Sequence, residues 1–216
     1  MYLFADLVVC NGIDFISAAL SRPLAIVDKM VVIDTGSTDG TLEFAQAMAA
    51  KFPEKLWVID HGSIAPDYDI SVVRNIGWNS APPETTWHWN ISDDEIYNWE
   101  DLPRLREFLT EHENDSARFV HIHFHEYGLN GDHNKRIYSE HDYHRVMIQR
   151  WTPKARWIGV WGREAVLYPD GKHTNSPDKD PSDILDPEIY YHHFNWLRKK
   201  YSEALKWYDH LRLNGM

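Results

Sequence analysis

Apolar and polar residues alternate along the first 115 residues in blocks that predict strands and helices in turn. Short apolar runs have the length of strands, and segments with apolar residues three or four positions apart have the period of helices. The expected strands are Tyr2–Cys10, Val31–Asp34, Leu56–Asp60 and Trp87–Ile91. The expected helices are Asp14–Leu20, Leu42–Phe52, Asp69–Ser80 and a helix that follows Asp101. Strands that alternate with helices favour an open α/β sheet with parallel strands.

The pattern changes after residue 115. The apolar stretches there predict strands without long helices between them, at Phe119–Phe124, Val146–Trp151, Arg156–Val160 and Ala165–Tyr168. Asp170–Pro187 is rich in Pro, Asp and Ser, which predicts an exposed loop that closes over a ligand. Apolar residues at helical spacing from Leu197 to Leu211 predict a last helix. We therefore expect one domain, residues 1–216, with a nucleotide-binding half (about 1–115) and an elaborated half (about 116–216).

Composition and charge narrow the classes of function. The chain has 216 residues, of which 43% are hydrophobic, enough for a large core. Its net charge of −11 argues against nucleic acid as a partner, because phosphate backbones bind basic surfaces. The one cysteine, Cys10, fits a reducing compartment, and no apolar run has the roughly 20 residues of a membrane span. The expected location is the cytoplasm, and the chain is compatible with a module of a longer protein.

Three acidic residues follow the strand Trp87–Ile91. Asp93, Asp94 and Glu95 repel one another unless a cation or solvent relieves them. One interpretation is a solvated turn that caps a helix. The other is a site for Mg²⁺ or Mn²⁺, which carboxylate oxygens bind and which usually also bind substrate phosphates.

Several short motifs occur in a fixed order along the chain. Cys-Asn-Gly-Ile-Asp follows the first expected strand, and Thr-Gly-Ser-Thr-Asp-Gly follows the strand that ends at Asp34. Arg-Asn-x-Gly then lies in the helix Asp69–Ser80, before the acidic motif, and Tyr-Tyr-His-His-Phe-Asn-Trp lies near the end of the chain. In this order the motifs resemble those of glycosyltransferase family 2. That resemblance covers most of the chain and implies an α/β fold of the GT-A type, with a Rossmann-like, mostly parallel sheet.

The resemblance implies which residues bind the nucleotide. Asp34 would contact the base or ribose, because a carboxylate can accept hydrogen bonds from both. The backbone around Cys10 and Asn11 would line the same pocket, and Arg74 would approach the diphosphate. Glycines in the loop after Asp34 allow a ligand to approach the backbone closely.

The resemblance also implies a metal site. Asp94 would take the place of the metal-binding Asp in the family's Asp-x-Asp motif. His193 would complete the metal or diphosphate site from the other end of the chain, although the sequence leaves open whether His192 or His193 is the ligand. Ser92 stands where the motif usually has its first Asp, and Asp93 is expected to compensate on the nucleotide side.

The implied activity is transfer of a hexose or deoxyhexose from a nucleoside diphosphate sugar, with UDP favoured, to a hydroxyl of a glycan or glycoprotein. The implied cofactor is Mn²⁺ or Mg²⁺. Inversion at the anomeric carbon requires a carboxylate base on the acceptor side. Relatives often carry Gly-x-x-His-Glu in the second half; here Glu164 matches the acid, whereas Arg163 replaces the His. Glu126 is the reserve candidate.

Other interpretations stay open. The chain could be a nucleotidyltransferase, or a nucleotide-sugar-binding module with weak or no catalysis because Ser92 depletes the acidic motif. A phosphatase of the haloacid dehalogenase type is disfavoured, because Gly36 stands where its general acid would be. The histidines at 121, 123 and 125 fall on one strand face and could bind zinc or line an acceptor cleft. Trp151, Trp157 and Trp161 could serve the core or stack on an acceptor sugar.

Overall fold

The computed structural model describes residues 1–63, 69–129, 136–159, 164–174 and 180–194, with the backbone alone for 125–129 and 136–146. Within these ranges the helices are α1 (Ile16–Ile26), α2 (Thr41–Lys51), α3 (Ile70–Asn79) and α4 (Asp101–Glu111). The strands are β1 (Leu3–Val9), β2 (Lys29–Asp34), β3 (Leu56–Asp60), β4 (Trp87–Ser92), β5 (Glu95–Tyr97), β6 (Phe119–Leu129), β7 (Arg136–Arg150), β8 (Arg156–Ile158), β9 (Ala165–Leu167), β10 (Ile184–Leu185) and β11 (Tyr190–His193).

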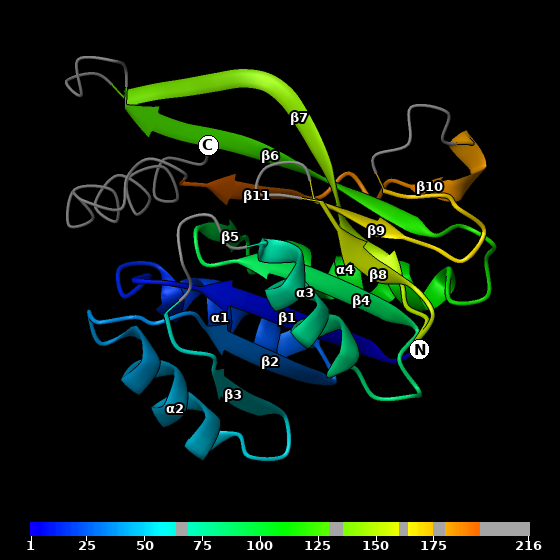
Figure 1. Ribbon diagram of the computed structural model, residues 1–216. Coiled ribbons are helices and arrows are strands. Elements are labelled where there is room, and N and C mark those ends of the chain that lie inside the picture. The colour runs from blue at the N-terminus through cyan, green and yellow to red at the C-terminus, as the bar shows by residue number, and fades with distance from the viewer. Residues whose placement is uncertain (64–68, 130–135, 160–163, 175–179, 195–216) are drawn as a thin grey trace.

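One sheet runs through both predicted halves of the chain. Its order among the described strands is β3-β2-β1-β4-β7-β6-β11-β5, with β10 paired to β6 (Figure 1). β1 to β4 are mutually parallel, in the 3-2-1-4 order of Rossmann-like sheets. β7 is antiparallel to both β4 and β6, so the sheet becomes mixed in its second half. The predicted α/β fold class, with a Rossmann-like half of parallel strands, is confirmed.

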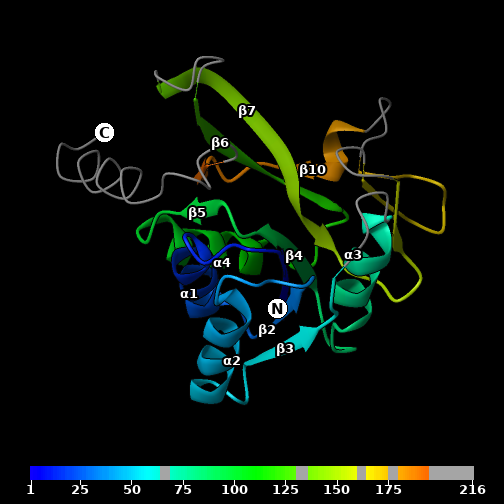
Figure 2. The same cartoon turned by 60° about the vertical axis from the view of Figure 1, so that its left-hand side comes forward.

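Helices cover both faces of the parallel half. Alternate residues of β1, such as Leu3 and Leu7, pack with α1, α2 and α4 in the larger apolar core. Phe4 on the other face packs with Ile70 and Val73 of α3. Figure 2 shows α3 on one side of the sheet and the other three helices on the opposite side. Because helices cover both faces of the sheet, the side chains on both faces of β1 are apolar, with Asp6 as the exception.

The second half is built around the long strands β6 and β7, which form a ribbon in Figure 1. β11 pairs parallel to β6 on one side and antiparallel to β5 on the other. The small strand β5 begins at Glu95, the last residue of the acidic motif, whereas β11 begins at Tyr190. This pairing therefore joins the end of the described chain to the acidic motif.

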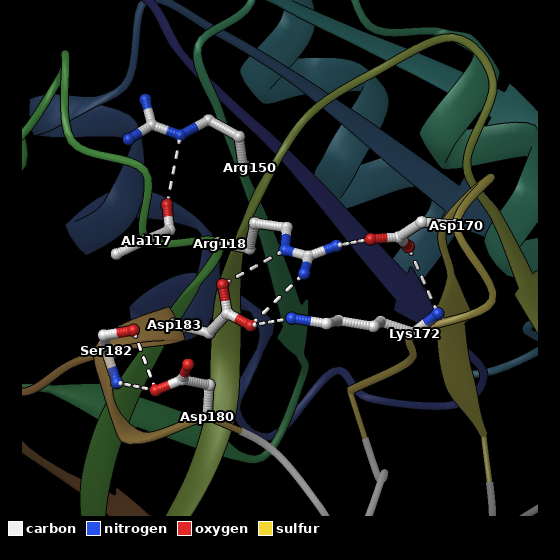
Figure 3. A network of polar contacts seen from close by, with 8 residues as sticks. All are labelled: Ala117, Arg118, Arg150, Asp170, Lys172, Asp180, Ser182 and Asp183. Atoms are coloured by element: carbon white, nitrogen blue, oxygen red, sulfur yellow. Dashed lines mark hydrogen bonds and ion pairs between the residues drawn. The ribbon is translucent and has the colours of Figure 1, made fainter.

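The segment Asp170–Pro187 is not a simple exposed loop in its described parts. Arg118, just before β6, contacts the carboxylates of Asp170 at 2.8 Å and Asp183 at 3.2 Å (Figure 3). Lys172 Nζ lies 2.8 Å from the same Asp183. Pro181–Asp183 forms a 3-10 turn, and β10 then pairs with the first residues of β6. These contacts lie at the amino end of β6. The expected closure of this segment over a ligand stays a prediction, and residues 175–179 lie outside the description.

The Arg-Asn-x-Gly motif connects α3 to the two-stranded sheet of β8 and β9. Asn75 Nδ2 donates to the carbonyl oxygen of Trp157 at 2.9 Å, and the Trp157 N–H donates to Asn75 Oδ1 at 2.8 Å. The Asn75 amide thus pairs with β8 as a neighbouring strand would. A Cβ at Gly77 would lie 2.8 Å from atoms of Asp6 in β1, so the glycine lets α3 approach the sheet.

Several element boundaries differ from those predicted. β6 and β7 extend beyond Phe119–Phe124 and Val146–Trp151 into the polar ribbon, while β8 ends at Ile158. β5, β10 and β11 were not predicted, because strands of two to four residues carry too little periodicity. The expected last helix lies outside the described residues.

Loss of the Asn75 side chain should loosen α3 from β8. Asn75→Ala removes two hydrogen bonds to the Trp157 backbone and should lower the free energy of unfolding by about 2 kcal/mol. Asn79→Ala is the matched control, because Asn79 is exposed on the same helix and should change stability by no more than about 0.5 kcal/mol. Urea denaturation measures both. Equal stability of the two variants would contradict this role.

Candidate functional site

The candidate site lies at the carboxyl edge of the parallel strands. Val9 is in register with Asp34, and Val8 is in register with Ser92. The loop after β1, the loop after β2 and the acidic motif therefore leave the sheet at the same level. Ligands of open α/β sheets bind at this edge.

Asp34 is buried at the end of β2. Its Oδ1 accepts hydrogen bonds from the N–H groups of Gly36 at 2.9 Å and Ser37 at 2.8 Å. Its Oδ2 is buried and has no hydrogen-bond partner among the described residues. A buried carboxylate oxygen without a donor is costly, so a ligand N–H or O–H there would be stabilising.

The loop after β1 is fastened to the loop after β2. The Asn11 N–H donates to Ser37 Oγ at 2.8 Å, and Asn11 Oδ1 accepts from the Thr38 N–H at 2.8 Å. Asn11 has a φ of 54°, in the left-handed region that Asn tolerates better than most residues. Cys10 is exposed beside it. The structure thus brings Cys10 and Asn11 next to the Asp34 loop, as their proposed common pocket requires.

Asp93 points beneath the loop after β1. It is 2% exposed, and a Cβ at Gly12 would lie 2.2 Å from Asp93 Oδ2. Any side chain at position 12 would therefore displace Asp93 or the loop. The predicted contact of Asp93 with the nucleotide stays a prediction.

Asp94 and His193 lie together, although 99 positions separate them in sequence. His193 Nε2 is 3.8 Å from Asp94 Oδ1, and both side chains are nearly buried. The cause is backbone pairing: His193 is in register with Glu95, and the Phe194 N–H donates to the Asp94 carbonyl oxygen at 3.0 Å. His193 is therefore the histidine beside Asp94, whereas His192 Nε2 lies 3.2 Å from Asn98 Oδ1. Which of the two binds a metal stays open.

The Asp94–His193 pair fits one divalent cation. Two ligand atoms that are each about 2.1 Å from one ion can be at most about 4.2 Å apart, and the observed 3.8 Å lies within that limit. A carboxylate with an imidazole suits Mn²⁺, and Mg²⁺ commonly takes one or two carboxylates plus substrate phosphates. Within the described ranges, no group of three or more His, Cys, Asp and Glu side chains could hold an ion. Two protein ligands would leave the remaining positions to a substrate and water.

Arg74 lies on the inner side of α3. Its Nη1 is 3.9 Å from Asp6 Oδ2, and its guanidinium lies 5.8 Å from the Trp157 ring centroid. The side chain is only 13% exposed. The contact with a diphosphate that the resemblance implies stays a prediction.

Asp6 is the centre of a buried polar cluster that the sequence analysis missed. Asn90 Nδ2 donates to both carboxylate oxygens of Asp6, at 3.1 and 3.0 Å, and His88 Nε2 lies 3.3 Å from Asp6 Oδ1. Burial raises the pKa of Asp6 to about 6, although Arg74 and Asn90 oppose the rise. Burial lowers the pKa of His88 to about 3, so the imidazole is neutral. A single Asp within an otherwise apolar strand was the sequence signal for this cluster.

Glu164 is half-buried and directly precedes β9. Its role as a base stays a prediction. Glu126, the reserve candidate, is in backbone register with His193 across β6 and β11.

Trp157 is 7% exposed in an apolar cluster, and Trp151 donates its Nε1–H to the Trp78 carbonyl oxygen, so both are packing residues.

Trp161 and the histidines of β6 were the remaining candidates for acceptor or metal contacts. Trp161 lies outside the described residues. Of the three histidines on β6, His123 lies 2.9 Å from both oxygens of Asp186, an ion-pair geometry rather than a described metal cluster.

Glu95 was missed as a structural member of the site: its Oε2 accepts from the Ser92 N–H at 2.9 Å and closes the acidic turn.

No protein-family model matches the chain, and no curated protein matches it in sequence. Among solved structures, the chain is similar to residues 1–349 of TarS from S. aureus in complex with UDP, with 21% identity and a TM-score of 0.43 over 61% of this chain. The chain spans 37% of that structure's length. It is also similar to 4-diphosphocytidyl-2C-methyl-D-erythritol synthase from Anaerococcus prevotii, with 8% identity and a TM-score of 0.42 over 69% of this chain and 71% of that one. These similarities concern the fold.

None of the helices in the described part of the chain combines the length and the apolar character needed to cross a bilayer.

Asp6 should make stability depend on pH. Because its folded pKa of about 6 lies above the ordinary 3.8, the neutral carboxyl favours folding below about pH 4, and that contribution is lost as the pH rises through 6. Asp6→Asn should therefore gain stability relative to the wild type, by up to about 3 kcal/mol, between pH 4 and pH 7. Denaturant unfolding at each pH measures the difference. Glu54→Gln, at an exposed position, is the control, and a difference for Asp6→Asn that is independent of pH would contradict the assignment.

Proposed function

We propose that this chain is a metal-dependent glycosyltransferase domain that uses a nucleoside diphosphate sugar, with UDP as the favoured nucleotide. The observation that carries the proposal is the 3.8 Å approach of Asp94 and His193 at the carboxyl edge of the sheet. Asp93, next to Asp94, packs against Gly12, and the neighbouring Asn11 is fastened to the Asp34 loop. The candidate metal pair is therefore continuous with the candidate nucleotide loops.

Asp34 would recognise the nucleotide. Its Oδ1 is occupied by the N–H groups of its own loop, whereas its buried Oδ2 can accept one more hydrogen bond. Uracil has one ring N–H that such an oxygen would accept, and ribose hydroxyls are further donors.

Asp94 and His193 would hold the divalent cation, Mn²⁺ or Mg²⁺. A bound cation at this place would neutralise the negative charge that develops on the departing diphosphate. The pairing of β11 with β5, and the hydrogen bond from the Phe194 N–H to the Asp94 carbonyl oxygen, would hold the two side chains in place. Ser92 contributes no carboxylate, so the donor's own phosphate oxygens would supply a larger share of the ligands.

Glu164 would act as the base on the acceptor hydroxyl. In an inverting transfer, the carboxylate removes the hydroxyl proton while the hydroxyl oxygen attacks the anomeric carbon and the bond to the diphosphate breaks. Glu164 directly precedes β9 and so belongs to the second half of the chain, which follows the Rossmann-like parallel strands. The acceptor would be a glycan or glycoprotein hydroxyl.

A nucleotidyltransferase would need cationic side chains around a triphosphate. The loop after β1, Cys10–Phe15, contains no Lys or Arg, which favours a diphosphate donor held through a cation. A binding module without catalysis would share the donor site but would neither transfer nor hydrolyse the sugar.

UDP and Mn²⁺ should stabilise the wild-type protein together. At one hundred times its dissociation constant, a ligand adds about 2.7 kcal/mol to the free energy of unfolding. Asp34→Asn keeps an oxygen for the loop N–H groups but replaces the unpaired oxygen, so it should lose stabilisation by UDP. Asp94→Asn should keep the effect of UDP alone and lose the added effect of Mn²⁺. Thermal unfolding with UDP, GDP and Mn²⁺ measures both.

Two outcomes of that experiment would count against the proposal. Equal or larger stabilisation by GDP would remove the uridine assignment. An undiminished Mn²⁺ effect in Asp94→Asn would remove the metal pair. Glu54→Gln is the control for the loss of a carboxylate elsewhere, since Glu54 is exposed.

Glu164→Gln should separate binding from catalysis. The amide cannot accept the acceptor's proton, so transfer should fall by roughly two to four orders of magnitude while UDP still stabilises the protein. Release of UDP from UDP-hexoses in the presence of glycan acceptors measures the rate, and NMR of the product gives its anomeric configuration. Near-normal transfer by this variant, or retained configuration, would exclude Glu164 as the base.

A further inference from the structure

His123 and Asp186 form a partly buried contact that the proposed function does not use. His123 Nε2 lies 2.9 Å from both carboxylate oxygens of Asp186, and the His123 side chain is only 9% exposed. Burial alone raises the pKa of Asp186, but hydrogen bonds from the Glu188 N–H and from His123 outweigh it and lower that pKa. Asp186 is therefore ionised at neutral pH and accepts a charge-assisted hydrogen bond, which is stronger than a neutral one.

Asp186 also shapes the turn that leads into β11. Its Oδ1 accepts from the Glu188 N–H at 2.9 Å. Glu188 has a φ of 52°, and outside Gly and Asn this left-handed conformation is unfavourable. The carboxylate of Asp186 thus holds a backbone conformation that Glu188 would not adopt by preference.

The strained turn fixes where β11 begins. Directly after it, the His123 N–H donates to the Ile189 carbonyl oxygen at 2.9 Å, and the Tyr190 ring lies 4.9 Å from the His123 ring. β11 then runs three residues further to His193, which faces Asp94. A change in the direction or register of β11 would carry His193 away from Asp94, because strand residues alternate between faces.

We infer that His123 is a positioning residue: through Asp186 it holds the Glu188 turn, and through that turn it sets β11 and the place of His193. The link from His193 to a metal rests on the proposed function. The positioning of β11 itself does not, and it can be measured without metal or nucleotide.

Hydrogen exchange of the β11 backbone tests the inference. His123→Ala should speed amide exchange in Tyr190–His193 about tenfold, the effect of losing one charge-assisted hydrogen bond. His123→Gln should stay close to the wild type, because its amide can donate to Asp186 from a similar position. Asp186→Ala, at a side chain that is 43% exposed, removes both acceptor oxygens and should reproduce the faster exchange. Unchanged exchange in His123→Ala and Asp186→Ala would overturn the inference.

A matched control separates this contact from the general loss of a histidine. His112 lies 3.7 Å from Asp115 at the end of α4, and His112→Ala should leave exchange in β11 unchanged. Exchange in β11 that rises equally in His112→Ala would show a global effect and overturn the inference.

Relief of the strain at Glu188 should act as a rescue. Glycine adopts a positive φ without cost in the folded state, so Glu188→Gly combined with His123→Ala should slow β11 exchange relative to His123→Ala alone. Glu188→Ala in the same background removes the side chain but keeps the strain, and it should give no rescue. Equal effects of the two substitutions would contradict the role of the turn.

The effect of His123 on metal binding is measured in a separate experiment. Titration of the UDP-bound protein with Mn²⁺ should give an affinity several-fold weaker in His123→Ala than in His123→Gln. If the wild type binds no Mn²⁺, the proposed metal site fails, while the exchange results still decide the positioning of β11. If the two variants bind Mn²⁺ equally well while exchange changes as expected, His123 positions β11 without affecting metal binding through His193. That result would overturn the link from His123 to His193.

Discussion

The double pairing of β11 is the constraint on which the candidate site depends. One edge of this four-residue strand pairs with β6 and the other with β5, so its backbone is fixed from both sides. Without that pairing, Asp94 would belong to a solvated acidic turn, which is the plain interpretation of the acidic motif. With it, His193 stands 3.8 Å from Asp94, and the Phe194 N–H closes on the Asp94 backbone. The chemistry proposed for the site therefore follows from strand pairing between distant segments.

A buried polar cluster lies within the parallel half of the chain, between the sheet and α3. Asp6, His88 and Asn90 occupy the sheet face beneath α3, where the neighbouring side chains are apolar. Burial of a carboxylate is costly, and the raised pKa of Asp6 reflects that cost. The cluster gives Arg74 a partner, and the next residue, Asn75, pairs with β8. The Arg-Asn-x-Gly motif thus has a structural role of its own, independent of any ligand.

Local patterns predicted the parallel half well because its strands and helices are long enough to show their periods. The same patterns placed Asp34 and the acidic motif at strand ends, and parallel strands bring their carboxyl ends to one edge. They could not predict β5 or β11, whose existence depends on partners about a hundred residues away. Composition predicted an exposed loop at Asp170–Pro187. It could not show the ion pairs of Arg118 with Asp170 and Asp183, because these residues are far apart in sequence. The approach of His193 to Asp94 was expected from a family resemblance rather than from periodicity.

Anomalous X-ray scattering from crystals grown with UDP and Mn²⁺ tests the central claim most directly. The proposal predicts one manganese peak within about 2.3 Å of both Asp94 Oδ1 and His193 Nε2, with diphosphate oxygens as further ligands. It also predicts that the uracil ring donates to Asp34 Oδ2. A manganese peak elsewhere on the protein, with UDP bound and none between Asp94 and His193, would contradict the account.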